Sequence, residues 1–136
     1  MGEAVAFLHQ AGTKAEERSA HREATACFEQ ALDALRHLPA QPEWQERASD
    51  LHLDVSRDLL TLGERAKGID HARRAEALAK SLGDERRGAQ AIVTLAIRAW
   101  MWGDSDRALE LGQRALAIAI RLNDASLQTS ANLTLG

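Results

Sequence analysis

The sequence predicts an all-α fold, a solenoid of about seven helices packed as antiparallel pairs. The first observation is internal repetition. Leu82-Gly83-Asp84 matches Leu122-Asn123-Asp124, and Gly63 matches Gly103, at an offset of 40 residues. Self-similarity at a period of roughly 20–50 residues is typical of stacked repeat units. The second observation is composition, because the abundant Ala, Leu, Arg and Glu residues favour helix. No stretch alternates apolar and polar residues for long enough to predict a strand.

Three helices are predicted before Gly63. In each of them, apolar residues recur at the i, i+3, i+4 and i+7 spacing of a half-buried helix. Residues 39–42 interrupt this pattern, and Pro42 suits the first turn of the third helix, where a missing N–H needs no partner. Gly63 then suits a left-handed cap at the end of that helix. The three predicted segments are about 3–17, 20–37 and 42–62.

Four more helices are predicted after Gly63. Gly83 closes the fourth and Asp84 opens the fifth, while Gly103-Asp104-Ser105 combines a helix stop with a cap for the sixth. Asp124 opens the seventh. The short connections between helices of similar length imply antiparallel neighbours. The four predicted segments are about 64–82, 84–102, 106–122 and 124–136.

Composition and charge narrow the functional classes. The chain has 136 residues, one domain's worth of sequence, and a net charge of −3, which does not fit the basic face of a nucleic-acid-binding protein. Cys27 is the single cysteine, so no intrachain disulfide can form and a reducing compartment fits. No apolar run approaches the ~20 residues of a membrane span, and the first residues do not resemble a signal peptide. We therefore expect a cytoplasmic protein with no nucleic-acid or membrane partner.

Small residues recur at matching positions in alternate helices, as Ala24-x3-Phe28-x2-Ala31, Gly68-x3-Ala72-x2-Ala75 and Ala108-x3-Gly112-x2-Ala115. This spacing resembles the tetratricopeptide repeat (TPR), a helix–turn–helix unit of 34 residues. The resemblance implies a right-handed superhelix, although the family's Trp and Tyr in the first helix of each unit are replaced. It also implies a partial fourth unit in which Leu135-Gly136 matches the family's Leu-Gly pair. The units are about 5–38, 49–82, 89–122 and 129–136.

A second resemblance concerns His21–Leu32 and Gly103–Leu109. Both runs look similar to the helical repeats that follow the ATPase module in bacterial nucleotide-cyclase-like regulators. In that setting the repeats form a C-terminal sensing or docking region. The chain has neither a cyclase nor an ATPase module, so this resemblance implies that it is a segment of a larger protein.

The sequence predicts no catalytic, metal or cofactor site. Gly63-x4-Gly68 has the glycine spacing of a phosphate-binding loop, but Ile69 and Asp70 stand where Lys and Ser or Thr are needed. Cys27 lies on an apolar stripe with no oriented base, which indicates a packed side chain and not a nucleophile. The histidines form no i, i+4 pair, so we expect them on solvated helix surfaces. We therefore expect no enzyme activity. The five histidines are His9, His21, His37, His52 and His71.

Two local features leave alternatives open. Trp100-Met101-Trp102 cannot all face one side of a helix, so this run is either core alone or core plus a ligand-binding surface. A cluster of basic residues in the central region indicates either a solvated face or a docking patch for an acidic partner segment. The cluster consists of Arg65, Lys67, Arg73, Arg74, Arg86 and Arg87.

The last predicted helix is expected to expose Leu127, Leu133 and Leu135 beside Ala115–Ile120, a run that is apolar at every position. A helix that is apolar all round is expected to be covered all round. Exposed apolar patches tend to meet a partner surface, and two-fold pairs are the commonest oligomers. We therefore expect a weak homodimer that forms through the C-terminal helices.

In the TPR family, the first helices of successive units line a concave groove. Some members hold a partner's C-terminal carboxylate there with Lys, Asn and Arg. The matching positions here are His9, Thr13, Asp54, Gln90 and Thr94, so this clamp is not expected. The residues that the register assigns to the partner-binding groove are His9, Gln10, Thr13, Glu16, Asp50, Leu53, Asp54, Arg57, Gln90, Thr94, Ile97, Trp100 and Met101.

Two functions fit these expectations. The first is a non-catalytic protein-interaction module that docks a peptide or a neighbouring domain in the concave groove. The second is a regulatory segment that senses a small effector and controls an attached ATPase or cyclase domain. A closed pocket around Trp100, bounded by Asp54 and Arg57, would favour the sensor, whereas an open groove would favour docking.

Overall fold

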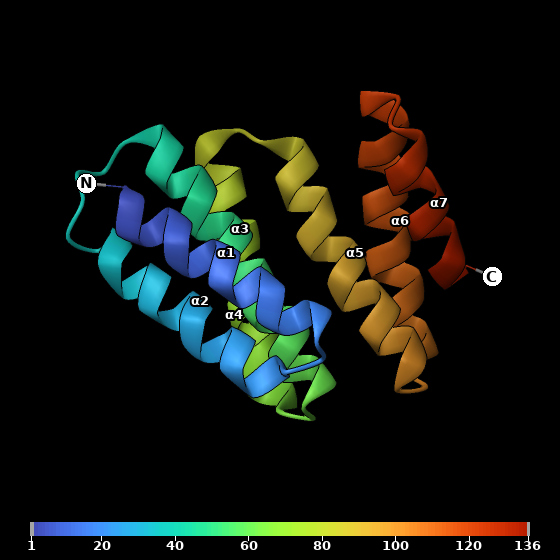
Figure 1. The fold of residues 1–136 in the computed structure, drawn as a ribbon. Helices are drawn as coiled ribbons and strands as arrows, with labels where there is room; N and C mark the ends of the chain where they lie inside the picture. Colours follow the sequence, from blue (N-terminus) through green and yellow to red (C-terminus); the bar gives the residue numbers. More distant parts are fainter. Residues whose placement is uncertain (1, 136) are drawn as a thin grey trace.

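The computed structural model describes residues 2–135, and in that range it consists of seven helices joined by short turns, with no strand (Figure 1). Residue 136 lies outside the described residues, and with it the second member of the Leu135-Gly136 pair. The helices are α1 (Glu3–Glu17), α2 (His21–Leu35), α3 (Pro42–Thr61), α4 (Arg65–Leu82), α5 (Glu85–Met101), α6 (Ser105–Leu122) and α7 (Ala125–Leu135).

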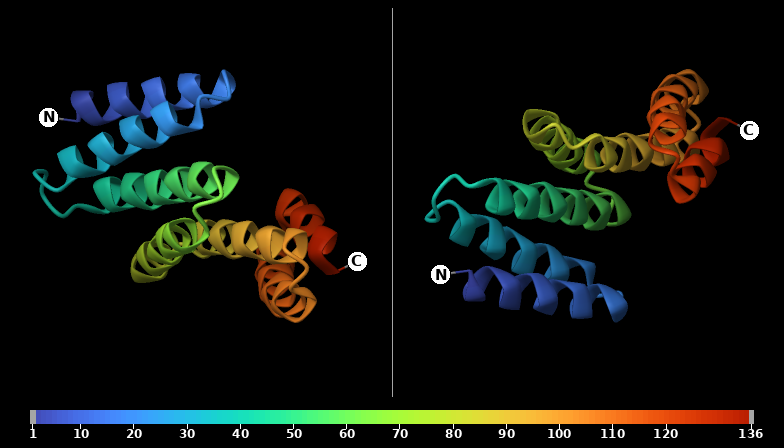
Figure 2. Two further views of the ribbon diagram at one scale, coloured as in Figure 1. Left: turned by 90° about the horizontal axis from the view of Figure 1, so that it is seen from below. Right: turned by 90° about the horizontal axis from the view of Figure 1, so that it is seen from above.

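Consecutive helices pack against one another along the whole chain. The pairs α1–α2, α3–α4 and α5–α6 form successive units, and α2–α3, α4–α5 and α6–α7 join each unit to the next. The first helices of neighbouring units also meet, because α3 contacts α5 and α5 contacts α7 (Figure 2). The all-α solenoid predicted from the sequence is therefore confirmed.

A turn of one type recurs every 20 residues in the second half of the chain. Gly63, Gly83, Gly103 and Asn123 have φ angles of 86°, 70°, 79° and 53°, in the left-handed region. The N–H of the next residue donates back to a helix carbonyl, as from Asp84 to Ala79 at 2.8 Å, which satisfies carbonyls left free at the helix end. Two such helix–turn segments make up the 40-residue offset of the sequence.

The acidic residue after three of these turns begins the next helix. An Oδ1 atom of Asp84, Asp104 and Asp124 accepts a hydrogen bond from the backbone N–H three residues later, at 3.1, 3.3 and 3.1 Å. Such a side chain satisfies one of the free N–H groups of the first turn. The sequence prediction that Asp84 and Asp124 open helices agrees with this geometry.

The core changes character along the solenoid. The largest fully buried side chains lie in α1–α3 and include Phe28 of α2, whose ring occupies the place that a Cβ on Gly12 would need. From α4 onward, the fully buried side chains are alanines. The C-terminal core also contains large side chains such as Ile92 and Leu111, each 3% exposed, so the two regions differ in which side chains are fully enclosed.

One expectation for the C-terminal helices is wrong. Leu127 is not exposed, because it belongs to the C-terminal core with Leu111 and Ala131 and is 8% exposed. Within the Ala115–Ile120 run, the neighbouring helices leave Ile120 60% exposed. Within residues 2–135, no helix is long and apolar enough to cross a membrane.

Candidate functional site

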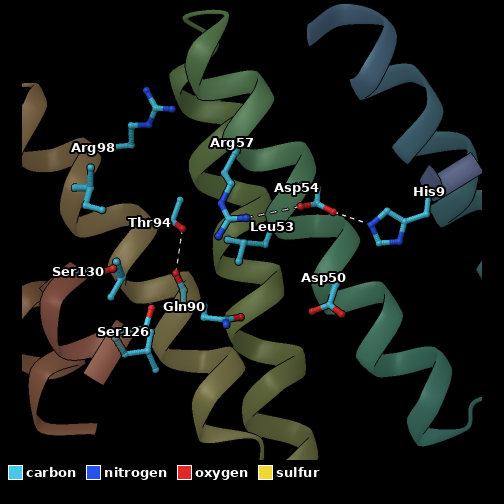
Figure 3. Close-up of a pocket in the computed structure, with 13 residues that line it drawn as sticks. His9, Asp50, Leu53, Asp54, Arg57, Gln90, Thr94, Arg98, Ser126 and Ser130 are labelled. Atoms are coloured by element: carbon cyan, nitrogen blue, oxygen red, sulfur yellow. Dashed lines mark hydrogen bonds and ion pairs between the residues drawn. The ribbon is translucent and has the colours of Figure 1, made fainter. Parts of the chain in front are cut away.

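A cavity of about 690 Å³ opens on the concave face between α1 and α3 on one side and α5 and α7 on the other (Figure 3). Every residue that lines it belongs to one of these four helices. The lining residues that the repeat register assigned to the groove are His9, Asp50, Leu53, Asp54, Arg57, Gln90, Thr94 and Ile97. The lining residues that it did not assign are Val93, Arg98, Ser126, Leu127 and Ser130.

Five groove residues expected from the sequence do not line this cavity: Gln10, Thr13, Glu16, Trp100 and Met101. The side chains of Trp100 and Met101, at the end of α5, are 59% and 60% exposed. The sequence-based condition for a sensor, a closed pocket around Trp100, is therefore not met by this cavity.

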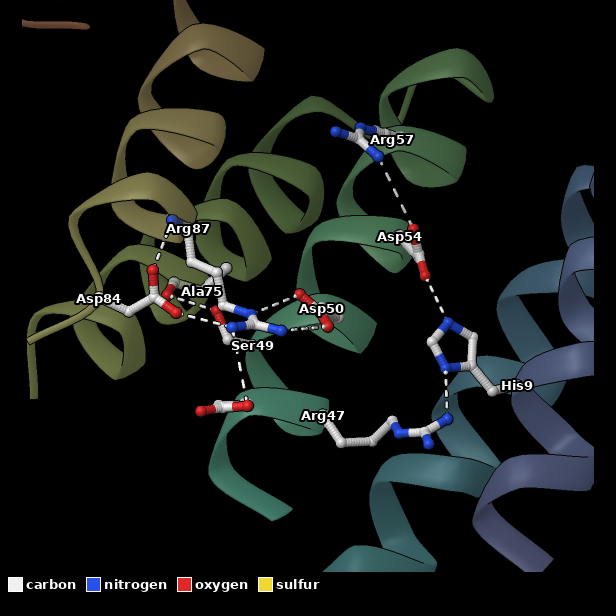
Figure 4. Close-up of polar contacts among 10 residues, drawn as sticks. His9, Arg47, Ser49, Asp50, Asp54, Arg57, Ala75, Asp84 and Arg87 are labelled. Carbon is white, nitrogen blue, oxygen red and sulfur yellow. Dashed lines mark hydrogen bonds and ion pairs between the residues drawn. The ribbon is translucent and has the colours of Figure 1, made fainter. Parts of the chain in front are cut away.

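Asp54 of α3 is the centre of a polar chain on the α1 side of the cavity (Figure 4). His9 Nε2 lies 2.8 Å from Asp54 Oδ2, and Arg47 Nη1 lies 3.2 Å from His9 Nδ1. A guanidinium can only donate, so Nδ1 accepts and the Nε2–H donates to Asp54. This fixes the ring and ties α1 to α3 across the N-terminal end of the groove.

Arg87 forms the corresponding tie between α5 and α3 (Figure 4). Its Nε and Nη2 atoms donate to the two carboxylate oxygens of Asp50 at 2.9 and 3.2 Å, and Nη1 donates to Asp84 at 2.6 Å. These hydrogen bonds, with Asp50 first, raise the pKa of Arg87 further. Such two-pronged arginine–carboxylate pairs fix geometry as well as charge. The negative charge of Asp50 is therefore already compensated by Arg87 within the protein.

A second carboxylate group lies behind the groove, where α1, α2 and α3 meet. Asp58 is 1% exposed, and its Oδ1 atom lies 2.8 Å from Nδ1 of His21. Its Oδ2 atom has no hydrogen-bond partner among the fixed donors of residues 2–135. Burial, followed by the negative charge on Asp58, raises the pKa of Glu16 to about 8. A neutral Glu16 avoids placing a second negative charge beside the buried Asp58.

His52 and His71 form a histidine pair between α3 and α4, with their Nδ1 atoms 2.9 Å apart. Burial, followed by the charge of His71, lowers the pKa of His52 to about 4, and burial also lowers the pKa of His71. The expectation that the histidines lie on solvated surfaces is wrong for His9, His21, His52 and His71, which are half-buried. Their partners lie 19 to 45 residues away, so only the packing of helices brings them together.

Several residues of the central basic cluster are engaged within the protein. Arg86 pairs with Asp124 at 2.8 Å and Arg74 with Asp70 at 3.0 Å, in addition to the Arg87 contacts. The guanidinium of Arg65 lies 3.9 Å from the centroid of the Trp102 ring. Within residues 2–135, no group of three or more His, Cys, Asp or Glu side chains is placed to hold a metal ion.

Comparison with known proteins shows the fold. No family model and no curated protein matches the sequence. A solved structure of the Rap conjugation gene regulator of plasmid pLS20, in complex with a Phr peptide, matches 93% of this chain and 34% of its own length with a TM-score of 0.83 and 16% identity. Aspartyl phosphate phosphatase F from Bacillus subtilis matches 90% of this chain and 31% of its own length, with a TM-score of 0.83 and 15% identity.

The chain therefore has a TPR-like helical-repeat fold and spans about a third of the length of both solved neighbours. At 15–16% identity these matches concern the arrangement of the helices. Both neighbours are larger proteins that contain this arrangement of helices.

Proposed function

We propose that the chain is a non-catalytic interaction module that docks an extended peptide, or a segment of a neighbouring domain, in its concave groove. The observation that carries this proposal is the cavity of about 690 Å³, which is lined only by α1, α3, α5 and α7. Inward-facing helices of a solenoid form an extended surface of this kind. The cavity is open to solvent, which suits a chain that passes through it.

The lining combines the two chemistries that an extended peptide needs. Leu53, Val93 and Ile97 supply apolar surface on α3 and α5. Gln90 on α5 and Ser130 on α7 add side chains that make no hydrogen bond with other described side chains. A peptide backbone presents unpaired N–H and C=O groups, and amide and hydroxyl side chains can satisfy both. The neighbour solved in complex with a peptide adds support.

The alternative is a regulatory segment that binds a small effector and controls an attached ATPase or cyclase domain. The cavity volume favours it, because small-molecule sites span roughly 300–1,000 Å³. Both functions have the chain acting as one segment of a larger protein, in line with its span of about a third of each neighbour. We favour docking because the cavity is open and Trp100 lies outside it.

The proposal can be tested by selecting, from a displayed library of random peptides, those that bind the intact chain. We expect selected peptides to lose about tenfold in affinity on Gln90→Ala or Ile97→Glu, because a buried polar or apolar contact is worth about 1.4 kcal/mol or more. The matched changes Arg73→Ala and Glu76→Ala, on α4, should leave affinity within about twofold. Equal losses on both faces, or selection of no peptide, would contradict docking in the groove.

We also propose weak self-association through α7, now without Leu127. Leu133 is 64% exposed on α7, whereas Leu127 is buried in the core. An exposed leucine on a helix surface can meet the same surface of a second copy. Sedimentation over a wide concentration range should show a monomer–dimer equilibrium that Leu133→Glu abolishes. A dimer unchanged by this substitution would place the contact elsewhere.

A further inference from the structure

The acidic residues that line the groove are already engaged by bases of the chain itself. Arg87 holds both carboxylate oxygens of Asp50, and His9 binds Asp54 at 2.8 Å. These two are the carboxylates among the lining residues. A basic side chain entering the groove would have to compete with these internal partners.

The two arginines that line the cavity are not engaged in the same way. The nearest carboxylate to Arg57 is that of Asp54, whose Oδ1 lies 3.7 Å from Nη1, beyond hydrogen-bond distance, and the Arg57 side chain is 50% exposed. Arg98 donates to the hydroxyl of Thr61 at 3.1 Å and has no carboxylate within 4.0 Å in the described part of the chain. Most of their N–H donors are thus free to meet a ligand.

Thr61, in the last turn of α3, contacts the backbone of Arg57 and the guanidinium of Arg98. It lies one helical turn after Arg57 on α3, and its hydroxyl donates to the Arg57 carbonyl at 2.9 Å. Arg98 reaches the same hydroxyl from α5. Figure 3 shows Arg57 and Arg98 on neighbouring helices, with the Arg57 guanidinium turned towards Asp54 and that of Arg98 turned away from it. The cavity is therefore lined by two guanidinium groups that no carboxylate holds at hydrogen-bond distance.

We propose that Arg57 and Arg98 form a subsite for an acidic side chain, Asp or Glu, of the docked peptide. The inference rests on the proposed docking function and adds the chemical class of the partner. A planar guanidinium matches the two oxygens of a carboxylate, and both side chains are long and partly exposed, so each can reach an acidic side chain in the groove. From the sequence, the central basic cluster indicated either a solvated face or a docking patch for an acidic partner segment. No residue of that cluster lines the cavity, whereas Arg57 and Arg98 do.

We assign the carboxylate to a side chain and not to a chain terminus. TPR proteins that hold a C-terminal carboxylate use positions that here carry His9, Asp54 and Thr94 among others, with an acid where a base is needed. Arg57 and Arg98 stand at other positions, on the α3 and α5 walls of the cavity. A peptide can therefore continue past them in both directions.

Pools of acetylated and amidated hexapeptides test this subsite. In each pool one position is fixed as Glu, Gln or Lys and the others are random, and binding to the intact chain is followed by fluorescence anisotropy. We expect Glu at one position to bind about tenfold more tightly than Gln, and Lys more weakly than both. High salt should reduce this preference, because both arginines are partly solvated.

Arg57→Gln and Arg98→Gln should each remove most of the preference for Glu, while Arg98→Lys should retain part of it. Arg73→Gln on α4, also an exposed arginine, should leave it unchanged. Pools that bind without a preference for Glu, or variants that keep it, would overturn the subsite and leave docking intact. Tight binding only of pools with a free C-terminal carboxylate would overturn the assignment to a side chain. Failure of every pool to bind would overturn docking and subsite together.

Discussion

Phe28, Leu51 and Val55 are fully buried in α2 and α3, whereas the fully buried side chains of α5, α6 and α7 are alanines. The two regions reach the same architecture by different packing. Large side chains fill the space between α1, α2 and α3, and small ones let the backbones of the last helices come close together. The fully enclosed positions are therefore occupied by large side chains in the first region and by alanines in the second, where large residues such as Ile92 and Leu111 stay 3% exposed.

The polar contacts of the two regions differ as well. In α3, the buried hydroxyl of Ser56 donates to the Gly68 carbonyl at 2.6 Å, and Asp58 is fully buried. In the C-terminal helices, the ion pairs Arg121–Glu85 and Arg114–Glu76 lie on the exposed surface. Exposed pairs contribute about 0–1 kcal/mol each. The N-terminal region is therefore where changes of protonation should alter stability.

The largest effect is expected from emptying the N-terminal core. Phe28→Ala should lower the free energy of unfolding by about 3–5 kcal/mol, because the buried ring leaves a cavity beside Gly12. Phe7→Ala, in α1, is the matched control, since Phe7 is 70% exposed and its loss should change stability by about 0.5 kcal/mol or less. Urea denaturation of both variants measures the difference. Equal losses would mean that Phe28 is not the central side chain of this region.

Overfilling the alanine-packed region should have the next largest effect. Ala115 of α6 is fully buried, so Ala115→Leu should destabilise the chain by about 1–3 kcal/mol. Ala117→Leu adds the same atoms two residues further along, on the exposed side of the same helix, and should change stability by about 0.5 kcal/mol or less. If Ala115→Leu were tolerated as well as Ala117→Leu, the C-terminal helices would not be closely packed.

The histidine pair makes the N-terminal region sensitive to acid. Unfolded His52 takes up a proton near its ordinary pKa of 6.5, but folded His52 does so only near a pKa of about 4. Stability is therefore lost as the pH falls from 6.5 towards 4. His52→Gln should lose less stability than the wild type between about pH 7 and about pH 5, whereas exposed His37→Gln should behave like the wild type. Thermal unfolding at each pH decides this, and identical slopes for all three proteins would contradict it.

Glu16, which is more exposed than His52 and therefore more strongly screened by solvent, predicts an effect of the opposite sign. Its pKa rises from 4.5 to about 8 on folding, so its contribution to stability is complete below pH 4.5 and is lost as the pH rises through 8. Glu16→Gln keeps a neutral side chain beside Asp58 and should be more stable than the wild type above about pH 8, but not below about pH 4.5. Exposed Glu17→Gln is the control. A gain that does not change with pH would show that Glu16 is not protonated in the folded chain.

Features that depend on neighbouring residues, such as helix boundaries, could be predicted from the sequence. Gly83 and Asp84 mark a helix boundary because a left-handed residue and a capping carboxylate act within one turn. The repeat register also placed Asp54 and Gln90 on helices that line the cavity, because every first helix of a unit faces the same side. It did not assign Arg98, although Arg98 follows Thr94 by one turn on the same face.

Other features depend on contacts between distant helices. The hydrogen bonds from His9 to Asp54 and from His21 to Asp58 join residues 45 and 37 positions apart, and neither spacing stands out in the sequence. Leu127 looked exposed because the helix that contains it was read by itself, whereas α5 and α6 pack against α7 and bury it. Such errors arise where tertiary packing decides the environment of a side chain.

Amide chemical shifts measured by NMR during titration with a selected peptide test the central claim, docking in the groove of the first helices. Both regions of the solenoid contribute to that groove. The account predicts that the largest changes occur at lining residues such as Asp50, Thr94 and Ser130, on α3, α5 and α7. Changes concentrated on the outer helices, for example at Glu29 and Arg73, would contradict it.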